Sequence, residues 1–376
     1  MSFSFSRWWA MVLKEFLQLK RDRLTFGMVV GIPLIQLILF GYAISSDPKH
    51  MPTAVLAADH SEFTRSFISA MEQSDYFRIV RDLPDEAAAH AALRRGEVMF
   101  VLNIPVGFTR ALLRGEKPAL LLEADATDPV ATGTALGSVE QMARAVMRKN
   151  IAGTLDFLAP GDLPFQVQVH RMFNPEANSQ HNIVPSLMGV ILTLTLVLMT
   201  GLAITRERER GTMENLLAMP VRPFEVMSGK ILPYIFVGLL QATLILLFAI
   251  LVFRVPFVGS LAMLYLTTLL FAAANLTVGI TLSSIARNQL QAMQMSVFYF
   301  LPNILLSGFM FPFQGMPGWA QGIGNVLPLT YFIRLVRGIF LKGIGGWDLW
   351  PNLWPLLLFT AVIMAVAVKC YRKTLD

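Results

Sequence analysis

A run of alternating charges between two long hydrophobic stretches is the segment of this sequence best suited to bind another protein. Six charged residues fall within nine positions, from Arg206 to Glu214. Apolar residues spaced i, i+3, i+4 from Met213 follow, and then Pro220. This pattern is typical of a short amphipathic helix at a membrane surface, with a charged start and a proline stop. The segment is longer than a turn requires, and we expect it to contact a partner in the cytoplasm.

Two other clusters contain groups capable of chemistry, but neither predicts a catalytic or metal site. Asp59-His60 with Glu62 suggests a metal or general-base site, yet lone histidines in a solvated domain usually cap helices or lie at the surface. Asp125-Ala-Thr-Asp128-Pro129 has the composition of a turn. The single cysteine, Cys370, excludes an intrachain disulfide and a cysteine metal site.

The sequence contains no phosphate-binding loop for a nucleotide. Its one Gly-Lys pair, Gly229-Lys230, is followed by Ile231 where such a loop needs Ser or Thr. Active transport by this chain would therefore draw energy from another subunit or from an ion gradient. Ion-coupled carriers place ionisable groups inside their spans, and the spans predicted below contain none. An external motor is favoured.

Composition places the chain in a membrane. Of its 376 residues, 55% are hydrophobic and only 15% charged, against about 25% charged in soluble domains. Seventeen of the 25 acidic residues lie between Asp47 and Glu176, which predicts a water-soluble insert. The net charge of +6 is explained by cations at membrane edges. No basic patch is interleaved with stacking aromatics, so nucleic-acid binding is not expected.

Six uncharged segments are long enough to cross a bilayer, which takes about 20 apolar residues. The fold class expected is an α-helical integral membrane protein with six transmembrane helices, a re-entrant helical hairpin before the last span, and an α/β extracytoplasmic domain between spans 1 and 2. The predicted spans are 24–46, 182–205, 231–253, 255–286, 289–311 and 349–368. The other parts are an amphipathic N-terminal helix (1–23), the external domain (47–181), a cytoplasmic loop (206–230), the hairpin with its external loop (312–347) and a tail (369–376).

Lysine and arginine counts orient these spans. Fourteen lie on the face that carries both termini and the 206–230 loop. The other face, without the insert, has four, namely Arg254, Arg334, Arg337 and Lys342. The first face is therefore cytoplasmic. We expect Arg334 and Arg337 to reach the outer interface, with contact to anionic lipid or substrate as the alternative. A cleaved signal peptide at 24–43 is disfavoured by its length and weak cleavage site.

The external insert alternates strand-like and helical segments, which predicts an α/β domain with a mostly parallel sheet. The expected strands are 53–58, 76–80, 98–104, 119–123 and 166–172. The expected helices are 61–74, 84–95, 106–114 and 130–158. Ser61 is a candidate N-cap, and Gly96 is suited to end the second helix.

Several short motifs are similar to those of one family of membrane transporters. They are Lys14-Glu15 with Arg21-Asp22, Phe173-Asn174-Pro175 with Ser179-Gln180-His181, Glu209-Arg-Gly-Thr-Met-Glu214, Lys230-Ile-Leu-Pro-Tyr234, Arg287-Asn288-Gln289 and Leu306-Ser-Gly-Phe309. Across nearly the whole chain the sequence resembles permease subunits of ABC-2 type (type V) exporters, in the branch with a large extracytoplasmic domain. The sequence especially resembles the Ybh-type multidrug exporter permeases. The block from Glu209 to Glu214 is the most specific motif.

The resemblance implies that the charged run is the coupling helix that docks on a cytoplasmic ABC ATPase. The coupling residues would be Arg206, Glu207, Arg208, Glu209, Arg210, Gly211, Thr212, Met213, Glu214 and Leu217. Gly211 permits a tight turn, Glu214 suits the helix dipole, and the arginines can pair with carboxylates of the motor. A merely solvated loop is the alternative. ATP and Mg would bind the partner ATPase, and this chain would hold no cofactor or metal.

The resemblance also implies a translocation path between two permease subunits, identical or paralogous, lined by spans two and five. Candidate path residues are Gln294, Phe300, Asn303, Ser307 and Met310, which are equally suited to helix–helix packing. Other partners expected are membrane lipids; a periplasmic adaptor is left open.

The function expected is that of an exporter permease in the bacterial inner membrane, with both termini cytoplasmic. It would move amphipathic drug-like or lipid-like substrates out of the cytoplasm or inner leaflet and would have no enzymatic activity itself. The alternatives are a lipid or polysaccharide-precursor exporter and a membrane-anchored sensor. The sensor is disfavoured because only residues 369–376 are expected after the last span, where a sensor needs an output domain.

Overall fold

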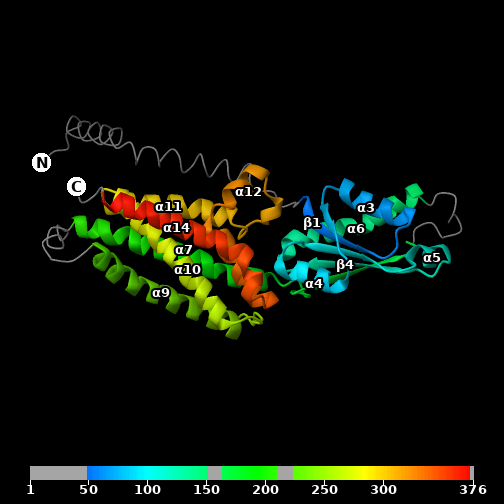
Figure 1. Cartoon of the computed structure of the whole chain (residues 1–376), viewed down its shortest axis with the longest axis horizontal. Coiled ribbons are helices and arrows are strands. Elements are labelled where there is room, and N and C mark those ends of the chain that lie inside the picture. Colours follow the sequence, from blue (N-terminus) through cyan, green and yellow to red (C-terminus); the bar gives the residue numbers. More distant parts are fainter. Residues whose placement is uncertain (1–48, 151–162, 210–222, 373–376) are drawn as a thin grey trace, which may run out of the picture.

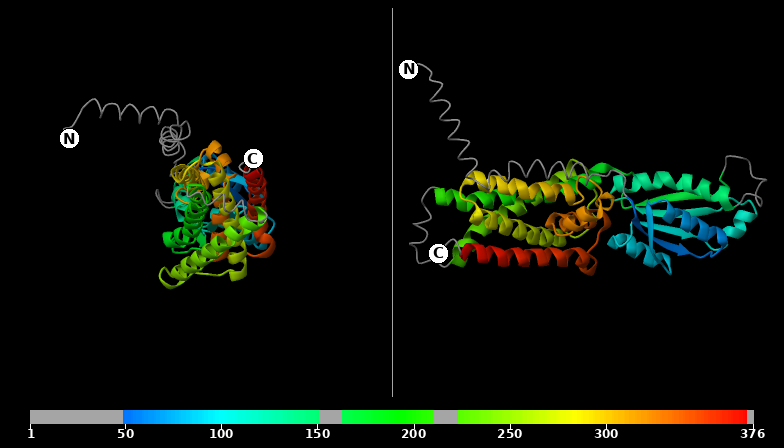
Figure 2. Two further views of the ribbon diagram at one scale, coloured as in Figure 1. Left: turned by 90° about the vertical axis from the view of Figure 1, so that its left-hand side faces the viewer. Right: turned by 90° about the horizontal axis from the view of Figure 1, so that it is seen from above.

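A helical bundle and an α/β domain are joined end to end in this elongated chain (Figure 1), and both views in Figure 2 agree on that arrangement. The computed structural model describes residues 49–150, 163–209 and 223–372. The predicted N-terminal helix 1–23, the span 24–46 and residues 373–376 of the tail lie outside this part. So do residues 210–222, which include most of the predicted coupling segment.

The α/β domain contains the five strands that the sequence predicts. They are β1 (Met51–Ala57), β2 (Phe77–Asp82), β3 (Phe100–Ile104), β4 (Ala119–Asp125) and β5 (Gln166–Met172). The strand order is β2-β1-β3-β4-β5. All neighbouring strands are parallel except β3 and β4. The expected mostly parallel sheet is confirmed.

The antiparallel strands β3 and β4 are connected by one short helix. Helix α5 (Phe108–Leu113) has six residues, so it advances only about 9 Å. Strand β3 with five residues is about 16 Å long. The helix by itself does not cover the length of β3, and β4 runs antiparallel beside β3.

Helices cover both faces of the sheet. They are α3 (Glu62–Gln73), α4 (Glu86–Arg95), α5 and α6 (Pro129–Asn150). Phe100 and Leu102 pack with α3, α5 and α6, whereas Val101 between them packs with α4. Alternate residues of β3 thus face opposite layers, as the strand period requires. Figure 1 shows α3 and α6 on one side of the sheet and α4 on the other.

Two predicted helix ends are borne out, the start of α3 at Ser61 and the end of α4 at Gly96. Ser61 accepts a hydrogen bond from the Thr64 backbone N–H (3.1 Å) and so caps α3. Gly96 ends α4 in the left-handed conformation, with φ of +69°. Helix α5 is shorter than the predicted 106–114 because Gly107, also left-handed, precedes it.

The bundle consists of long helices that run along the axis of the molecule (Figure 1). They are α7 (Ser179–Glu209), α9 (Pro223–Leu251), α10 (Leu261–Ile285), α11 (Gln289–Leu306) and α14 (Trp350–Arg372). Four of them, α7, α9, α10 and α14, are long and apolar enough to cross a membrane within the described residues. The chain is therefore a multi-pass membrane protein, and a count of six spans remains a prediction.

Two predicted spans are longer than their helices. The span 255–286 begins too early, because Val258 donates its backbone N–H to Phe340 O (2.9 Å) and helix α10 starts only at Leu261. The span 289–311 ends too late, because α11 stops at Leu306 and Gly308 has a φ of +84°. The sequence did not indicate either helix end, because both predicted spans are uncharged throughout.

A broken helical segment lies between α11 and α14, where the re-entrant hairpin is expected. It comprises η2 (Phe313–Gly315), α12 (Gly318–Gly324), α13 (Pro328–Arg337), η3 (Gly338–Lys342) and η4 (Gly346–Leu349). The axis turns by 84° between α12 and the α13–η3 helix. Figure 1 places α12 at the end of the bundle next to the α/β domain.

Close packing holds α13 against the bundle. Phe332 of α13 stacks on Phe271 of α10, with ring centroids 4.1 Å apart and planes at 8°. Gly189 of α7 lets α13 approach, because a Cβ atom there would lie 2.6 Å from Leu329 Cδ1 and 2.8 Å from Phe332 Cδ1. This contact fixes the position of the broken segment relative to α7.

We predict that Gly189→Ala lowers the free energy of unfolding by about 1–3 kcal/mol, because the added methyl overpacks the α7–α13 contact. Gly133→Ala in α6 is the matched control: nothing lies within 4 Å of its Cβ position, so it should raise stability by about 0.5–1 kcal/mol. Thermal unfolding of the purified full chain measures both. A Gly189→Ala variant as stable as Gly133→Ala would contradict the packing described here.

Candidate functional site

Charged side chains join the α/β domain to the end of the bundle. We call this set the charged joint; it consists of Arg94, Arg95, Asp125, Asp128, Arg337, Lys342 and Asp348. Lys342 ends η3 and forms a buried ion pair with Asp125, the last residue of β4. Its Nζ also donates to Leu93 O (3.1 Å) and lies 5.2 Å from the centre of the Phe173 ring. A carboxylate, a helix carbonyl and an aromatic face therefore surround this ammonium group.

Arg337 connects three separate parts of the chain. Its Nε donates to Ser186 Oγ of α7 (2.8 Å), and its Nη2 donates to Gly308 O after α11 (3.1 Å). Its Nη1 lies 3.8 Å from Asp128 Oδ2 of the α/β domain. Asp128 also accepts from the Ala131 backbone N–H (3.2 Å) at the start of α6. One guanidinium thus positions a span, the end of α11 and the base of the α/β domain.

A third contact closes the charged joint near α14. Asp348 Oδ1 accepts from Arg95 Nε (2.7 Å), and Asp348 Oδ2 lies 3.3 Å from Arg94 Nη2. The pairing with Asp348 raises the pKa of the Arg95 guanidinium. Both arginines are in the last turn of α4, so α4 is attached to the bundle by its C-terminal end.

The joint bears on two sequence expectations. The Arg337 side chain is 13% exposed and bonded to protein groups, so it does not extend freely toward lipid. That Arg334 and Arg337 lie at the outer interface stays a prediction. The Asp125–Pro129 segment is a turn, as expected, since Asp125 accepts from the Thr127 backbone N–H (3.2 Å) and hydroxyl (2.8 Å). The sequence did not indicate that these carboxylates pair with Lys342 and Arg337. The available signal was two carboxylates, Asp125 and Asp128, at the start of a long helix.

The Asp59 cluster has a structural role in the described chain. Its carboxylate accepts from the Thr109 backbone N–H (2.9 Å) and the Ser61 backbone N–H (3.1 Å), at the starts of α5 and α3. Burial opposes ionisation, but these hydrogen bonds together lower the pKa of Asp59. Among the described residues, no group of three or more His, Cys, Asp or Glu side chains is arranged to hold a metal ion.

Two hollows adjoin the charged joint. The larger, the charged hollow, has a volume of about 400 Å³ and is bordered by Arg94, Arg95, Arg334, Arg337, Lys342 and Ser307, among others. The smaller, the apolar hollow, has a volume of about 260 Å³. Its walls are Asp128, Pro129, Val130, Ser179, Asn182, Ile183 and residues 309–312. Asp128 borders both hollows.

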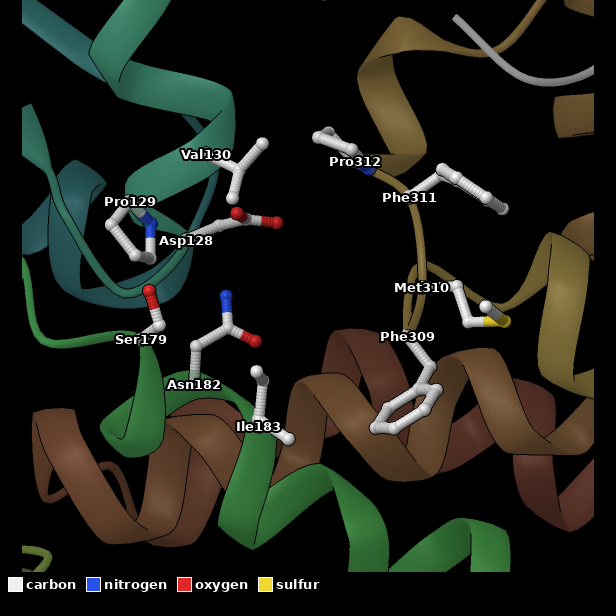
Figure 3. A pocket seen from close by; sticks show the side chains of 10 residues that line it. All are labelled: Asp128, Pro129, Val130, Ser179, Asn182, Ile183, Phe309, Met310, Phe311 and Pro312. Atoms are coloured by element: carbon white, nitrogen blue, oxygen red, sulfur yellow. The ribbon is translucent and has the colours of Figure 1, made fainter. Parts of the chain in front are cut away.

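Figure 3 shows the apolar hollow between the α/β domain, the start of α7 and the chain after α11. Asp128 and Asn182 extend toward one another on one side, while Met310 and Phe311 lie opposite. Val130, Ile183 and Met310 are 54%, 44% and 49% exposed. The hollow combines apolar walls with a carboxylate and an amide, which suits an amphipathic ligand.

The structure places the five predicted path residues on α11 and just after it. Asn303 and Ser307 are buried, one turn apart; Gln294 and Phe300 are partly buried, and Met310 borders the apolar hollow. Gln294 Oε1, Asn303 Oδ1 and Ser307 Oγ have no hydrogen-bond partner within the described residues. Ser307 borders the charged hollow. Whether these residues line a path remains a prediction.

At the opposite end of the bundle, Glu209 binds the start of α11. Its Oε1 accepts from the Gln289 backbone N–H (2.8 Å), and its Oε2 accepts from Gln289 Nε2. The backbone hydrogen bond, followed by the side-chain one, lowers the pKa of the Glu209 carboxyl. Of the other predicted coupling residues, Arg206 is exposed on α7, and residues 210–217 lie outside the described chain.

Fold and site together define a multi-pass membrane protein whose α/β domain is fastened to the end of its helical bundle. The profile of the ABC-2 family transporter proteins matches residues 23–369. The chain therefore belongs to the ABC-2 transporter family and is a permease of that family.

Relatives of similar length come from Escherichia coli strain K12. The chain is 27% identical to the probable multidrug ABC transporter permease YbhR, over 98% of this chain and 99% of that one. It is 33% identical to the probable multidrug ABC transporter permease YbhS, over 89% and 88% of the two chains. It is 28% identical to the inner membrane transport permease YhhJ, over 91% and 93%.

We predict that Lys342→Met destabilises the chain by about 3–5 kcal/mol, because it leaves the Asp125 carboxylate buried without its cation. The side chains of Lys342 and Asp125 are only 8% and 7% exposed. Adding Asp125→Leu should restore most of the loss, since an apolar pair needs no counter-ion. Thermal unfolding of the full chain in detergent measures all variants.

Arg114→Met is the matched control for this prediction. Arg114 lies 3.6 Å from Glu116 in a pair whose side chains are 64% and 55% exposed, so its loss should change stability by less than about 0.5 kcal/mol. Equal unfolding midpoints for Lys342→Met and Arg114→Met would show that the Lys342–Asp125 pair does not hold the domains together.

Proposed function

We propose that this chain is the membrane subunit of an ATP-driven exporter that moves amphipathic, drug-like or lipid-like molecules out of the cytoplasm or inner leaflet. The observation that carries the proposal is the family match over residues 23–369, which includes every described span. The sequence has no phosphate-binding loop. ATP and Mg would therefore bind a separate cytoplasmic ATPase, and the substrate class is supported by the multidrug names of two relatives.

In this proposal the segment from Arg206 to Leu217 is the contact with the ATPase. Glu209 supports a mechanical role, because its two hydrogen bonds connect the end of α7 to the start of α11. Helix α11 has 18 residues and so spans about 27 Å. Past its far end, Gly308 O accepts from Arg337, which also faces Asp128 of the α/β domain. A displacement at the ATPase would thus be carried along α11 to the charged joint.

The translocation path is proposed to lie between this chain and a second permease, identical or paralogous. Support comes from the buried oxygen atoms of Gln294, Asn303 and Ser307, which find no partner within the described residues. A buried polar atom without a hydrogen bond is unfavourable, and a second subunit, water or cargo would supply the missing partner. Both termini would be cytoplasmic and the α/β domain periplasmic.

We predict that the affinity-tagged full chain copurifies with a soluble ATPase from its native membrane. The variant Glu209→Lys/Glu214→Lys, whose charges oppose the proposed contact, should lose that ATPase while remaining folded. Quantitative mass spectrometry of the two preparations measures the ratio. Absence of any ATPase from the wild-type preparation would contradict the proposed exporter function.

A second prediction concerns how Glu209 acts. Glu209→Ala should lower substrate-stimulated ATP hydrolysis, because it releases the start of α11. Gln289→Leu should lower ATP hydrolysis less than Glu209→Ala does, because the hydrogen bond from the backbone N–H of residue 289 to Glu209 remains. The rate of ATP hydrolysis by the reconstituted complex, with and without transported drug, is the measurement.

Gln73→Leu is the control for Gln289→Leu, since Gln73 is an exposed glutamine that donates only to Ser69 Oγ (3.3 Å) in the α/β domain. It should leave ATP hydrolysis unchanged. If Glu209→Ala lowers ATP hydrolysis and Gln289→Leu leaves it unchanged, Glu209 contacts the ATPase directly instead of holding α11.

A further inference from the structure

Among the residues that the structure describes, one cation that borders the charged hollow is not paired with a carboxylate. Its bordering cations are Arg94, Arg95, Arg334, Arg337 and Lys342, and its bordering carboxylates are Glu97, Asp125 and Asp128. Asp348 neutralises Arg94 and Arg95 from just outside, Asp125 pairs with Lys342, and Asp128 lies against Arg337. Within the described chain, Arg334 has no ion pair and no hydrogen bond.

Aromatic rings hold the Arg334 guanidinium in place. Its Cζ atom lies 4.6 Å from the centre of the Phe313 ring and 5.8 Å from that of Tyr331. Such contacts fix the plane of a guanidinium but leave its N–H donors unused. Because Arg334 borders the charged hollow, these donors are available to a molecule inside it.

A second unused polar group borders the same hollow. Ser307 is 2% exposed, and its Oγ has no hydrogen-bond partner within the described residues. The hydroxyl and the guanidinium border the same hollow, and both have hydrogen-bond donors without acceptors within the described residues. An oxyanion accepts several hydrogen bonds at once and pairs well with the planar arginine fork. The surrounding carboxylates do not oppose such a ligand strongly, because each already faces a cation.

The neighbouring surface is apolar. The apolar hollow shares Asp128 with the charged hollow, and its walls include Val130, Ile183 and Phe309. A ligand with an anionic head and a hydrocarbon body would therefore find an anion site and an apolar surface side by side. A free anion would use only the first.

We propose that the charged hollow binds the phosphate group of an anionic amphiphile, with Arg334 and Ser307 as its ligands. If the bound amphiphile is transported cargo, the proposal rests on the proposed exporter function. The binding itself does not depend on that function. It assigns Arg334 a role distinct from Arg337 and Lys342, which hold the two domains together. It also favours phospholipid-like molecules among the amphipathic substrates.

Equilibrium binding to the purified full chain in a neutral detergent, without ATPase or ATP, tests the proposal. The probes are dihexanoyl phosphatidate, dihexanoyl phosphatidylcholine and inorganic phosphate, each titrated by calorimetry. Wild-type protein should bind phosphatidate at least about tenfold more tightly than either of the others. Equal affinity for the two lipids would overturn the proposal. Equal affinity for phosphatidate and inorganic phosphate would also overturn it, because the site would then bind a free anion and not an amphiphile.

Variants then test the residue. Arg334→Gln should weaken phosphatidate binding about tenfold and leave phosphatidylcholine binding unchanged, and Arg334→Lys should weaken it less because the charge remains. Arg110→Gln, at an exposed arginine of α5, should bind as wild type does. If Arg334→Gln does not fold, the proposal is tested by the phosphatidate affinity of Arg334→Lys and by the wild-type affinities for phosphatidate and phosphatidylcholine.

Binding and transport have separate outcomes. Unchanged phosphatidate affinity in Arg334→Gln overturns this inference even if the exporter function holds. Lost affinity in that variant supports the inference even if no ATPase is ever found with the wild-type chain.

Discussion

The requirement that a buried charge be paired governs how the two halves of this molecule fit together. Lys342 and Asp125 are both almost fully buried, and an isolated charge in such a place is strongly unfavourable. Neither half can satisfy its own member of the pair. The α/β domain must therefore dock on the bundle in the one orientation that also brings Arg337 to Asp128 and Asp348 to the end of α4. These contacts restrict tilting of the domain, because they lie around its base and not at a single point.

The same arrangement explains why α11 is central to the proposed mechanism. Its first residue is held by Glu209 and the carbonyl just past its last turn by Arg337, so both ends of the helix are attached to groups outside it. Helix α7 is tied in a similar way, through Ser186 near its start and Glu209 at its end. Close packing around Gly189, Phe271 and Phe332 also fixes α7 and α10 against α13. In the proposed exporter, a helix tied at both ends would transmit displacement along its axis from the ATPase contact to the charged joint.

Local patterns predicted the α/β domain well. The five strands, the Ser61 cap and the Gly96 helix end depend on nearest neighbours in sequence, and so does the approximate position of each apolar helix. The ends of α10 and α11 were misplaced because Val258 and Gly308 interrupt helices through contacts or backbone conformation and not through composition. The charged joint was missed altogether. Arginine near a bilayer edge has a plausible solvated position, and only the folded chain reveals that Asp128 lies within reach of Arg337. The coupling segment from residue 210 onward, and the path residues, stay predictions.

The pairing of Lys342 with Asp125 has a consequence for how the chain is made. These residues are 217 positions apart, and synthesis at about 5–20 residues per second separates their appearance by roughly 10 to 40 s. During that interval the Asp125 carboxylate has no cation from the bundle, because α7, α9, α10 and α11 are made before η3. The ion pair that attaches the α/β domain to the bundle can therefore form only after η3 has been synthesised, so the domain that is made first receives its buried counter-ion late in synthesis.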